Sequence, residues 1–312
     1  MHTQYRPGLH RYAFATAVAT LLLLVAGGLV TSNDAGLSVP DWPLSYGSLF
    51  PPMVGGIVYE HSHRMIATLV GLMTIGLVVW VGRTEHRAWV RRLAYAALAL
   101  VILQGVLGGL TVLFYLPRPI SIAHATMAQI FFTLVAALAL FTSRWWLTAA
   151  PLPATEASRQ TEKFALWTAL TILVQLILGA AYRHGWLGIT PHLLGAGAVL
   201  VATSWTGRLV RQAAPAVAMV TRLRILLSSL VGTQILLGLG AWWAVVRNQQ
   251  ALQPLPEMVW LTVAHLACGA LTLATATLLW LALRRVTASR AVDETGLRTA
   301  IYPSALQEGG RQ

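Results

Sequence analysis

The chain has 312 residues, of which 56% are apolar and only 10% are charged, and its formal net charge is +12. Soluble domains carry roughly a quarter charged residues, so this composition argues against a soluble protein. A basic excess can indicate nucleic-acid binding. The distribution of the basic residues along this chain instead favours a membrane protein, so we expect no nucleic-acid partner.

Eight apolar stretches are each long enough to cross a membrane as a helix, which needs about 20 mostly apolar residues. They cover residues 13–31, 58–82, 93–116, 120–142, 164–182, 188–207, 223–246 and 258–283. Each is far longer than a buried strand, and in lipid only helices or closed barrels satisfy the backbone. The first stretch follows a short basic segment but lacks a cleavage site, so we expect an uncleaved helix. The sequence therefore predicts an all-α integral membrane protein with eight transmembrane helices.

The basic residues alternate with the predicted crossings. If the N-terminus is cytoplasmic, 18 of the 22 Lys and Arg residues fall in inner segments and three in outer loops. This is the positive-inside pattern. We expect a multi-pass protein of the cell (plasma) membrane with both termini in the cytoplasm.

Related glycine-containing strings recur in the odd-numbered spans and indicate an internal repeat. Gln104 to Gly109 in the third span resembles Gln234 to Leu239 in the seventh, Gln175 to Gly179 lies in the fifth, and Gly27-Gly28 has a comparable place in the first. Small residues let membrane helices approach closely, and glutamines can hydrogen-bond across helices. Room beside a bulky planar ligand is a second, compatible interpretation.

The repeat predicts two pseudo-symmetric four-helix bundles in parallel orientation. We expect an N-terminal bundle over residues 1–148, a cytoplasmic linker over 149–163, a C-terminal bundle over 164–285 and a poorly ordered cytoplasmic tail over 286–312. The long outer loop between Ser32 and Ile57 leaves room for a lid over a bound group. Cys268, the single cysteine, is expected to be a small packing residue.

Histidines recur near the outer end of every even-numbered span. They are His63 in the second, His124 in the fourth, His192 in the sixth and His265 in the eighth. Ionisable residues inside a membrane are costly and usually functional. Two imidazoles that face each other across a helical bundle can supply both axial ligands of a haem iron. Zinc fits less well because each half offers only two such histidines and no thiolate, and a copper site lacks its cysteine.

The string Glu60-His61-Ser62-His63-Arg64 adds a carboxylate to one of these sites. Glu60 and His63 are three residues apart and share a helix face. His61 points elsewhere and is expected at the membrane interface. A structural alternative for Glu60 is an ion pair with Arg64, while Arg64 could also pair with a haem propionate. No carboxylate stands beside His192, so the two halves differ: the first is expected to be catalytic and the second supporting.

With these features the sequence resembles the haem A synthase family over all eight spans. The matching residues are Gly27 to Thr31, Trp42-Pro43-Leu44, Glu60 to Arg64, Gln104 to Gly109, Ala123-His124, His192 and Ala264-His265. The Glu-x-x-His-Arg string is nearly uninformative alone, whereas the ordered set of four histidines with the repeat is specific.

The resemblance implies oxidation of a ring methyl of haem O to a formyl group by successive hydroxylations, with loss of water from a geminal diol. His63 and His124 would then hold the substrate haem, and Glu60 would act in the chemistry. His192 and His265 would hold haem b, which would carry electrons away. The protein positions and tunes these groups, and the iron performs the difficult chemistry. Haem O synthase and an unidentified electron acceptor are the implied partners, and the sequence leaves the oligomeric state open.

One departure from the family concerns the first outer loop. Many members have a cysteine pair flanking the Trp-Pro, whereas Ser38 and Ser45 stand here. A disulfide or thiol role for this loop is therefore not expected.

Two other functions remain open on the sequence. A di-haem electron-transfer protein, such as a quinol-oxidising cytochrome b, would use the same four histidines and leave Glu60 as a structural or proton-relay group. A transporter is disfavoured because the spans lack paired glycine or proline breaks at mid-membrane.

Overall fold

The computed structural model describes residues 4–151 and 155–301, with side chains up to residue 287. These ranges contain nine helices: α1 (Pro7–Ser32), α2 (Gly56–Thr84), α3 (Ala88–Leu113), α4 (Arg118–Phe141), α5 (Arg144–Thr148), α6 (Glu156–Arg183), α7 (Ile189–Ala213), α8 (Ala218–Arg247) and α9 (Pro256–Ile301). Eight of the nine described helices, all except α5, are long and apolar enough to cross a membrane. The expected all-α fold with eight candidate spans is thus confirmed for this part of the chain.

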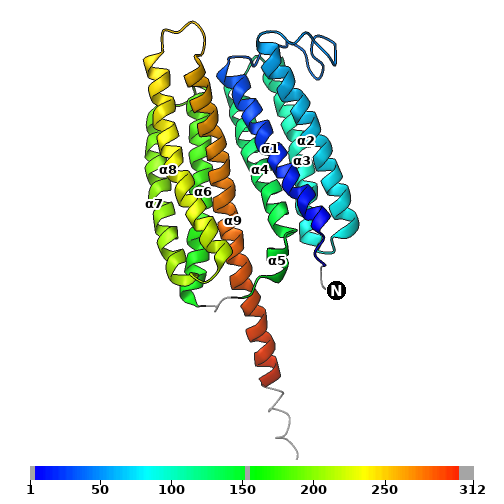
Figure 1. The fold of residues 1–312 in the computed structure, drawn as a ribbon, viewed down its shortest axis with the longest axis vertical. Helices are drawn as coiled ribbons and strands as arrows, with labels where there is room; N and C mark the ends of the chain where they lie inside the picture. The colour runs from blue at the N-terminus through cyan, green and yellow to red at the C-terminus, as the bar shows by residue number, and fades with distance from the viewer. Residues whose placement is uncertain (1–3, 152–154, 302–312) are drawn as a thin grey trace, which may run out of the picture.

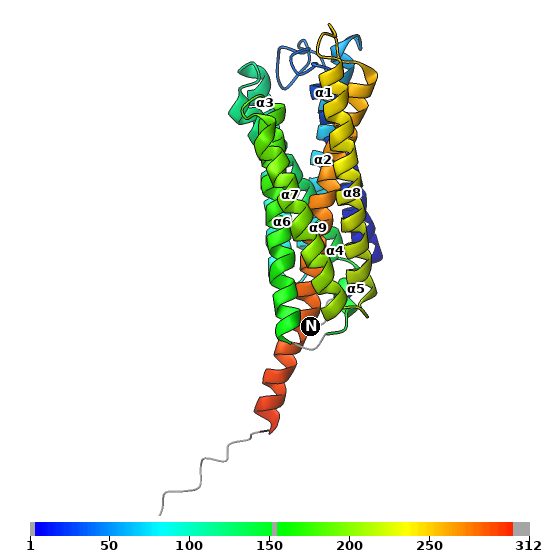
Figure 2. The ribbon, with the colours of Figure 1, turned by 90° about the vertical axis from the view of Figure 1, so that its left-hand side faces the viewer.

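The long helices form two neighbouring groups, α1–α4 and α6–α9 (Figure 1). In the first group α1 contacts α2 and α4, and α3 also contacts both. In the second, α9 contacts α8 and α6, and α7 also contacts both. The groups meet where α9 packs against α1 and α4 and where α4 packs against α6. All eight run roughly along the same axis (Figure 2). The pseudo-symmetry of the groups and the proposed domain boundaries stay predictions.

Two elements at the inner end differ from expectation. The connection expected over 149–163 is shorter because α6 begins at Glu156, where the Thr155 hydroxyl accepts the Ser158 N–H at 3.1 Å and caps the helix. The segment expected to be poorly ordered from residue 286 is helical as far as Ile301. It has no proline before Pro303, so the helix can continue and satisfy its backbone hydrogen bonds. Residues 302–312 of the expected tail lie outside the described residues.

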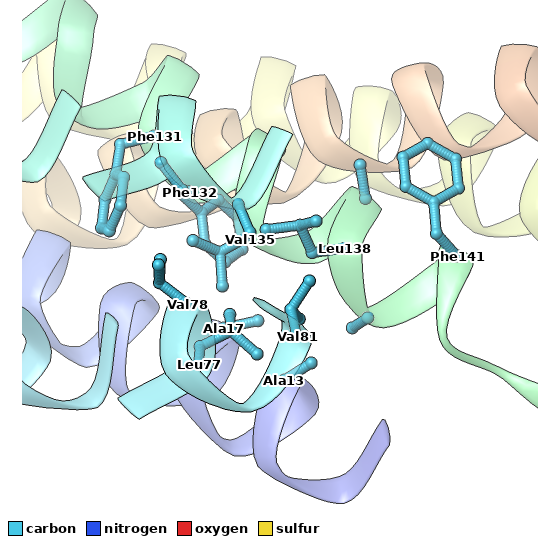
Figure 3. Packing of buried hydrophobic residues seen from close by; sticks show 14 of the residues in the cluster. Ala13, Ala17, Leu77, Val78, Val81, Phe131, Phe132, Val135, Leu138 and Phe141 are labelled. Carbon is cyan, nitrogen blue, oxygen red and sulfur yellow. The ribbon is translucent and has the colours of Figure 1, made fainter. Parts of the chain in front are cut away.

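The core of the first group is packed between α1, α2 and α4 (Figure 3). Leu77 and Val81 of α2 meet Val135 and Leu138 of α4, and all four are fully buried. Ala13 lies opposite them on α1, where its small side chain allows a close helix approach. This packing fixes the lower parts of the helices that carry the candidate ligands above.

Leu138→Ala should lower the stability of the protein by about 2–5 kcal/mol, because it leaves a cavity in a packed core. Leu22→Ala is the matched control, since Leu22 is 58% exposed on the lipid side of α1 and its loss should change stability by less than about 0.5 kcal/mol. Thermal unfolding of the purified proteins in detergent, followed by circular dichroism, measures both. Equal effects of the two substitutions would contradict this assignment of the core.

Candidate functional site

The four candidate ligand histidines lie within about the first three turns of their helices. His63 is on α2, His124 on α4, His192 on α7 and His265 on α9. Each of these helices begins at the end of the bundle that carries the long loop before α2 (Figure 1). All four imidazoles are partly buried. The structure therefore places them at comparable depth, two in each group of helices.

Each imidazole packs against a glycine on a neighbouring helix of its own group. A Cβ placed on the glycine would lie 3.1 Å from the histidine Cε1 for Gly27 and His63, 3.4 Å for Gly108 and His124, 3.0 Å for Gly179 and His192, and 2.9 Å for Gly238 and His265. A side chain at these glycines would therefore press on the ring. The sequence offered two interpretations of these glycines: close approach of helices and room beside a planar ligand. The structure shows that the helices do approach closely and that the histidine ring fills the space beside each glycine.

His192 and His265 have a spacing that suits one iron between them. Their ring centroids are 6.2 Å apart and their planes are inclined at 78°. Two imidazoles that each bind an iron at about 2 Å have centroids about 6 Å apart. His265 Nδ1 lies 3.2 Å from the main-chain oxygen of Gln234, to which it can donate. That hydrogen bond leaves Nε2 unprotonated, which is the form that ligates a metal.

His63 and His124 form the corresponding pair in the first group. They are close enough to interact electrostatically. The Nδ1 atoms of both rings are buried and make no hydrogen bond. Buried polar atoms without a partner are uncommon in folded proteins and call for an explanation. Iron bound at Nε2 would leave the ring proton on Nδ1, which still has no acceptor here, so a haem between His63 and His124 stays a prediction.

Glu60 is buried and held by two hydrogen bonds. The carboxylate is only 3% exposed; its Oε1 accepts from Arg64 Nη2 at 2.6 Å, and its Oε2 accepts from the N–H of Val39 at 2.9 Å. The structural alternative for Glu60, an ion pair with Arg64, is therefore present. The corresponding position before His192 is Ile189, so only the first pair has an adjacent carboxylate.

Arg64 connects helix α2 to the outer loop. Besides Glu60, it donates to the main-chain oxygens of Asp41 at 2.8 Å and Leu44 at 2.6 Å. These contacts occupy the guanidinium that we expected to reach a haem propionate. That propionate contact stays a prediction and would require Arg64 to exchange one of its present partners.

Further hydrogen bonds fasten the outer loop over the start of α2. Ser45 Oγ bonds to His61 Nδ1 at 2.9 Å, and the Tyr46 hydroxyl donates to the Ser38 carbonyl at 2.8 Å. Asp41 accepts from the N–H groups of Tyr46 and Gly47, and the Gly47 hydrogen bond in particular lowers the pKa of Asp41. The loop folds over the His61 ring and leaves it 8% exposed, and the expected position of His61 at the membrane interface stays a prediction.

The loop also reaches α3 through Trp42. Its ring packs on Gly109, where an added Cβ would lie 2.8 Å from the indole. Gly108, the preceding residue, packs against the His124 ring. Adjacent residues of α3 therefore contact the outer loop and a candidate ligand. The loop therefore covers the outer end of the first histidine pair.

Sequence reasoning missed a junction between the two groups of helices. Arg183, at the end of α6, donates to Ser32 Oγ at the end of α1 at 2.7 Å, and Ser32 Oγ bonds to Thr262 Oγ1 of α9 at 3.0 Å. His184 follows Arg183 and interacts electrostatically with His124 of the other group. Burial lowers the pKa of His184. No periodic pattern in the sequence brings these residues together.

Gly238→Ala should weaken haem retention, because the new methyl group would displace the His265 ring at a cost of about 1–3 kcal/mol. Gly232→Ala is the control on the same helix, since no atom lies within 4 Å of its added Cβ. The haem-to-protein ratio and the Soret absorbance of the purified variants measure the effect. A Gly238→Ala protein with full haem content would contradict the role of this contact.

Arg64→Ala should destabilise the protein by about 3 kcal/mol, because it leaves the buried Glu60 charge unpaired. Adding Glu60→Gln should restore part of this loss, which a double-mutant cycle of thermal unfolding would quantify. Arg159→Ala provides the comparison, because it breaks the ion pair with Glu156 that has exposed side chains and should cost less than about 1 kcal/mol. Additive effects of the Arg64 and Glu60 changes would count against their coupling.

Residues 56–190 match the family of cytochrome oxidase assembly proteins. This segment includes Glu60 to Arg64 and His124, and it ends two residues before His192.

Similar proteins named heme A synthase occur in several bacteria. The chain is 35% identical to that of Alkalihalophilus pseudofirmus over 117 residues, which are 36% of this chain and 39% of the relative. It is 30% identical to that of Shouchella clausii over 183 residues, covering 57% and 60%, and 32% identical to that of Symbiobacterium thermophilum over 127 residues, covering 40% and 42%. The matched segments thus span between 39% and 60% of these relatives.

Proposed function

We propose that this protein oxidises a ring methyl of haem O to a formyl group. The matches described above support its membership of the haem A synthase family. One observation carries the proposal beyond the family: a buried carboxylate, Glu60, stands one turn before a candidate axial histidine in one group of helices and not in the other. That difference gives one pair of histidines a proton acceptor beside a bound ring and leaves the other pair without one.

In this proposal the first group holds the substrate. His63 and His124 would hold the iron of haem O. Glu60 lies three residues before His63 and therefore faces the edge of that ring. Oxidation of a methyl carbon releases protons, and a carboxylate fixed by Val39 and Arg64 can take one up when Arg64 moves aside. With electrons leaving the substrate, the formyl oxygen comes from water (–CH3 + H2O → –CHO + 4 H+ + 4 e−), and the loop that covers this end limits the access of other solvent to the reacting carbon.

The second group holds haem b through His192 and His265. Their spacing of 6.2 Å between ring centroids supports this assignment. Bound haem iron supplies the one-electron chemistry that amino-acid side chains lack. The chain contributes the ligands and the contact of α9 with α1 and α4, which brings the second group against the first. Electrons from the substrate then have a short path between the groups.

The setting follows from the charge pattern. We place the protein in the cell membrane with both termini in the cytoplasm, so that the histidines and the covering loop lie toward the outer face. Haem O synthase delivers the substrate in this proposal, and an electron acceptor outside the chain removes the electrons.

A di-haem electron-transfer protein is the second candidate function, and the Glu60–Arg64 ion pair favours it. A carboxylate held at 2.6 Å from a guanidinium has a sufficient structural role without any chemistry. The two candidates differ in whether haem O is converted, which the following experiment decides.

Glu60→Gln should keep the haem spectrum but lower haem A formation by about 100-fold or more, since positioned acid–base groups contribute that much. The protein is co-expressed with a haem O synthase, and the extracted pigments are separated by chromatography. Glu257→Gln is the control, because Glu257 is an exposed carboxylate at the same end of the molecule. Normal haem A formation in Glu60→Gln would remove its catalytic role. A wild-type protein with full haem content that leaves haem O unconverted would establish the di-haem alternative.

Reporter fusions test the orientation. A periplasmic phosphatase fused after residue 250, in the connection between α8 and α9, should be active, because that connection is placed outside. The same enzyme fused after residue 216, between α7 and α8, should be inactive, and green fluorescent protein should show the opposite behaviour. Activity at residue 216 would reverse the proposed topology.

A further inference from the structure

Four helices each have a glycine that packs against a candidate ligand histidine. On three of these helices a glutamine lies four residues before that glycine, and on the fourth it does not. The glutamines are Gln104 on α3, Gln175 on α6 and Gln234 on α8; Leu23 takes this place on α1. The main-chain oxygen of Gln234 lies 3.2 Å from His265 Nδ1. The side-chain amide distinguishes three of the four pairs from the pair of Gly27 and His63.

Each glutamine amide contacts the histidine of the neighbouring helix whose ring packs against the glycine four residues after that glutamine. Gln104 Nε2 donates to the main-chain oxygen of His124 at 2.9 Å. Gln175 Nε2 donates to the main-chain oxygen of His192 at 2.9 Å and lies 3.1 Å from its Nδ1. Gln234 Nε2 lies 3.3 Å from His265 Nε2. These polar contacts join three candidate ligand residues to the neighbouring helix. The contact is to the main chain of His124, to the main chain and Nδ1 of His192, and to Nε2 of His265, the nitrogen that a haem iron would take in place of the amide.

His63 has no such tether. Leu23 is a partly buried apolar side chain that packs against the core of the first group, and His63 Nδ1 is buried without a hydrogen bond. The Gly27 contact keeps the ring in place sterically, but no side chain on α1 at this level can donate to it. His124 Nδ1 likewise makes no hydrogen bond, so His63 differs from the other three candidate ligands in one respect: it has no amide contact from the neighbouring helix.

This difference affects how strongly a histidine holds a metal. The polar neighbours of a ligating imidazole orient its ring and raise its basicity, and losing one typically weakens metal affinity 10–100-fold. Ligation through Nε2 also places the proton of the neutral ring on Nδ1. The side-chain oxygens of all three glutamines are buried and have no hydrogen-bond partner, so each amide has an acceptor that is not yet used.

We propose that Gln104, Gln175 and Gln234 are positioning residues that hold three axial histidines, and that Leu23 makes His63 the ligand that releases haem first. The functional interpretation of this difference between His63 and the other three histidines rests on the proposed function. A substrate haem has to enter and its product has to leave, whereas a resident haem stays. An untethered ligand in the first group and two tethered ligands in the second meet both needs.

Haem transfer tests the proposal without any oxidation of a methyl group. The full-length protein is loaded with haemin in detergent and mixed with excess apomyoglobin, and the Soret change is followed. The wild-type protein should lose haem in a fast and a slow phase. Leu23→Gln should slow the fast phase about tenfold, while Leu23→Met, which matches its volume without an amide, should leave it unchanged.

Gln175→Leu is the reciprocal variant. It should speed the slow phase about 10–100-fold and shift the electron paramagnetic resonance signal of the low-spin ferric haem, which reports the orientation of the two imidazoles. If Leu23→Gln fails to fold, this variant and Gln104→Leu carry the test alone. Unchanged loss rates with intact Soret bands, or a single phase in the wild-type protein, would overturn the proposal.

The outcomes separate this proposal from the proposed function. Altered loss rates together with unconverted haem O would refute the synthase activity and keep the positioning role of the glutamines. Normal haem A formation with unaltered loss rates would keep the activity and refute the positioning role.

Discussion

The contact of an imidazole ring with a glycine on the adjacent helix is the constraint on which the candidate site depends. A histidine inside a membrane must be buried and oriented, because lipid offers it no hydrogen-bond partner. A helix without a side chain at that level lets the ring lie against its backbone. Gly27, Gly108, Gly179 and Gly238 provide this surface on four helices. The glycines therefore fix where each ring lies, and the core beneath them holds the helices in place.

The two groups of helices share this scaffold and differ in the side chains added to it. Glu60 and Arg64 stand beside His63, whereas Ile189 takes the place of Glu60 before His192. Gln175 tethers His192, whereas Leu23 stands at the equivalent place on α1. The first group thus has a charged neighbour beside His63 and an amide contact only at His124, while the second has amide contacts at both histidines and no carboxylate beside His192. Chemistry in one group and retention in the other is the division that these two differences support.

The spans and the four histidines could be predicted because both depend on local, periodic signals. A run of about 20 apolar residues is visible in any window of the sequence, and the histidines recur at the same place in alternate spans. The partners of Arg64 and His61 could not be predicted, since they come from an irregular loop about 16 to 25 residues away in sequence, where no period constrains the geometry. The Arg183–Ser32 contact joins residues 151 positions apart. The recurrence of the glycines could be predicted from the sequence, but their individual contacts with the four histidine rings are known only from the structure.

The hydrogen bonds that attach the outer loop to the bundle involve no thiol and no disulfide. Ser45 bonds to a ring nitrogen, Tyr46 to a carbonyl, and Arg64 to two further carbonyls. The only thiol of the chain, Cys268, is buried within α9. A change in the thiol–disulfide balance of the surroundings therefore leaves the hydrogen bonds that hold this loop over the first histidine pair unchanged.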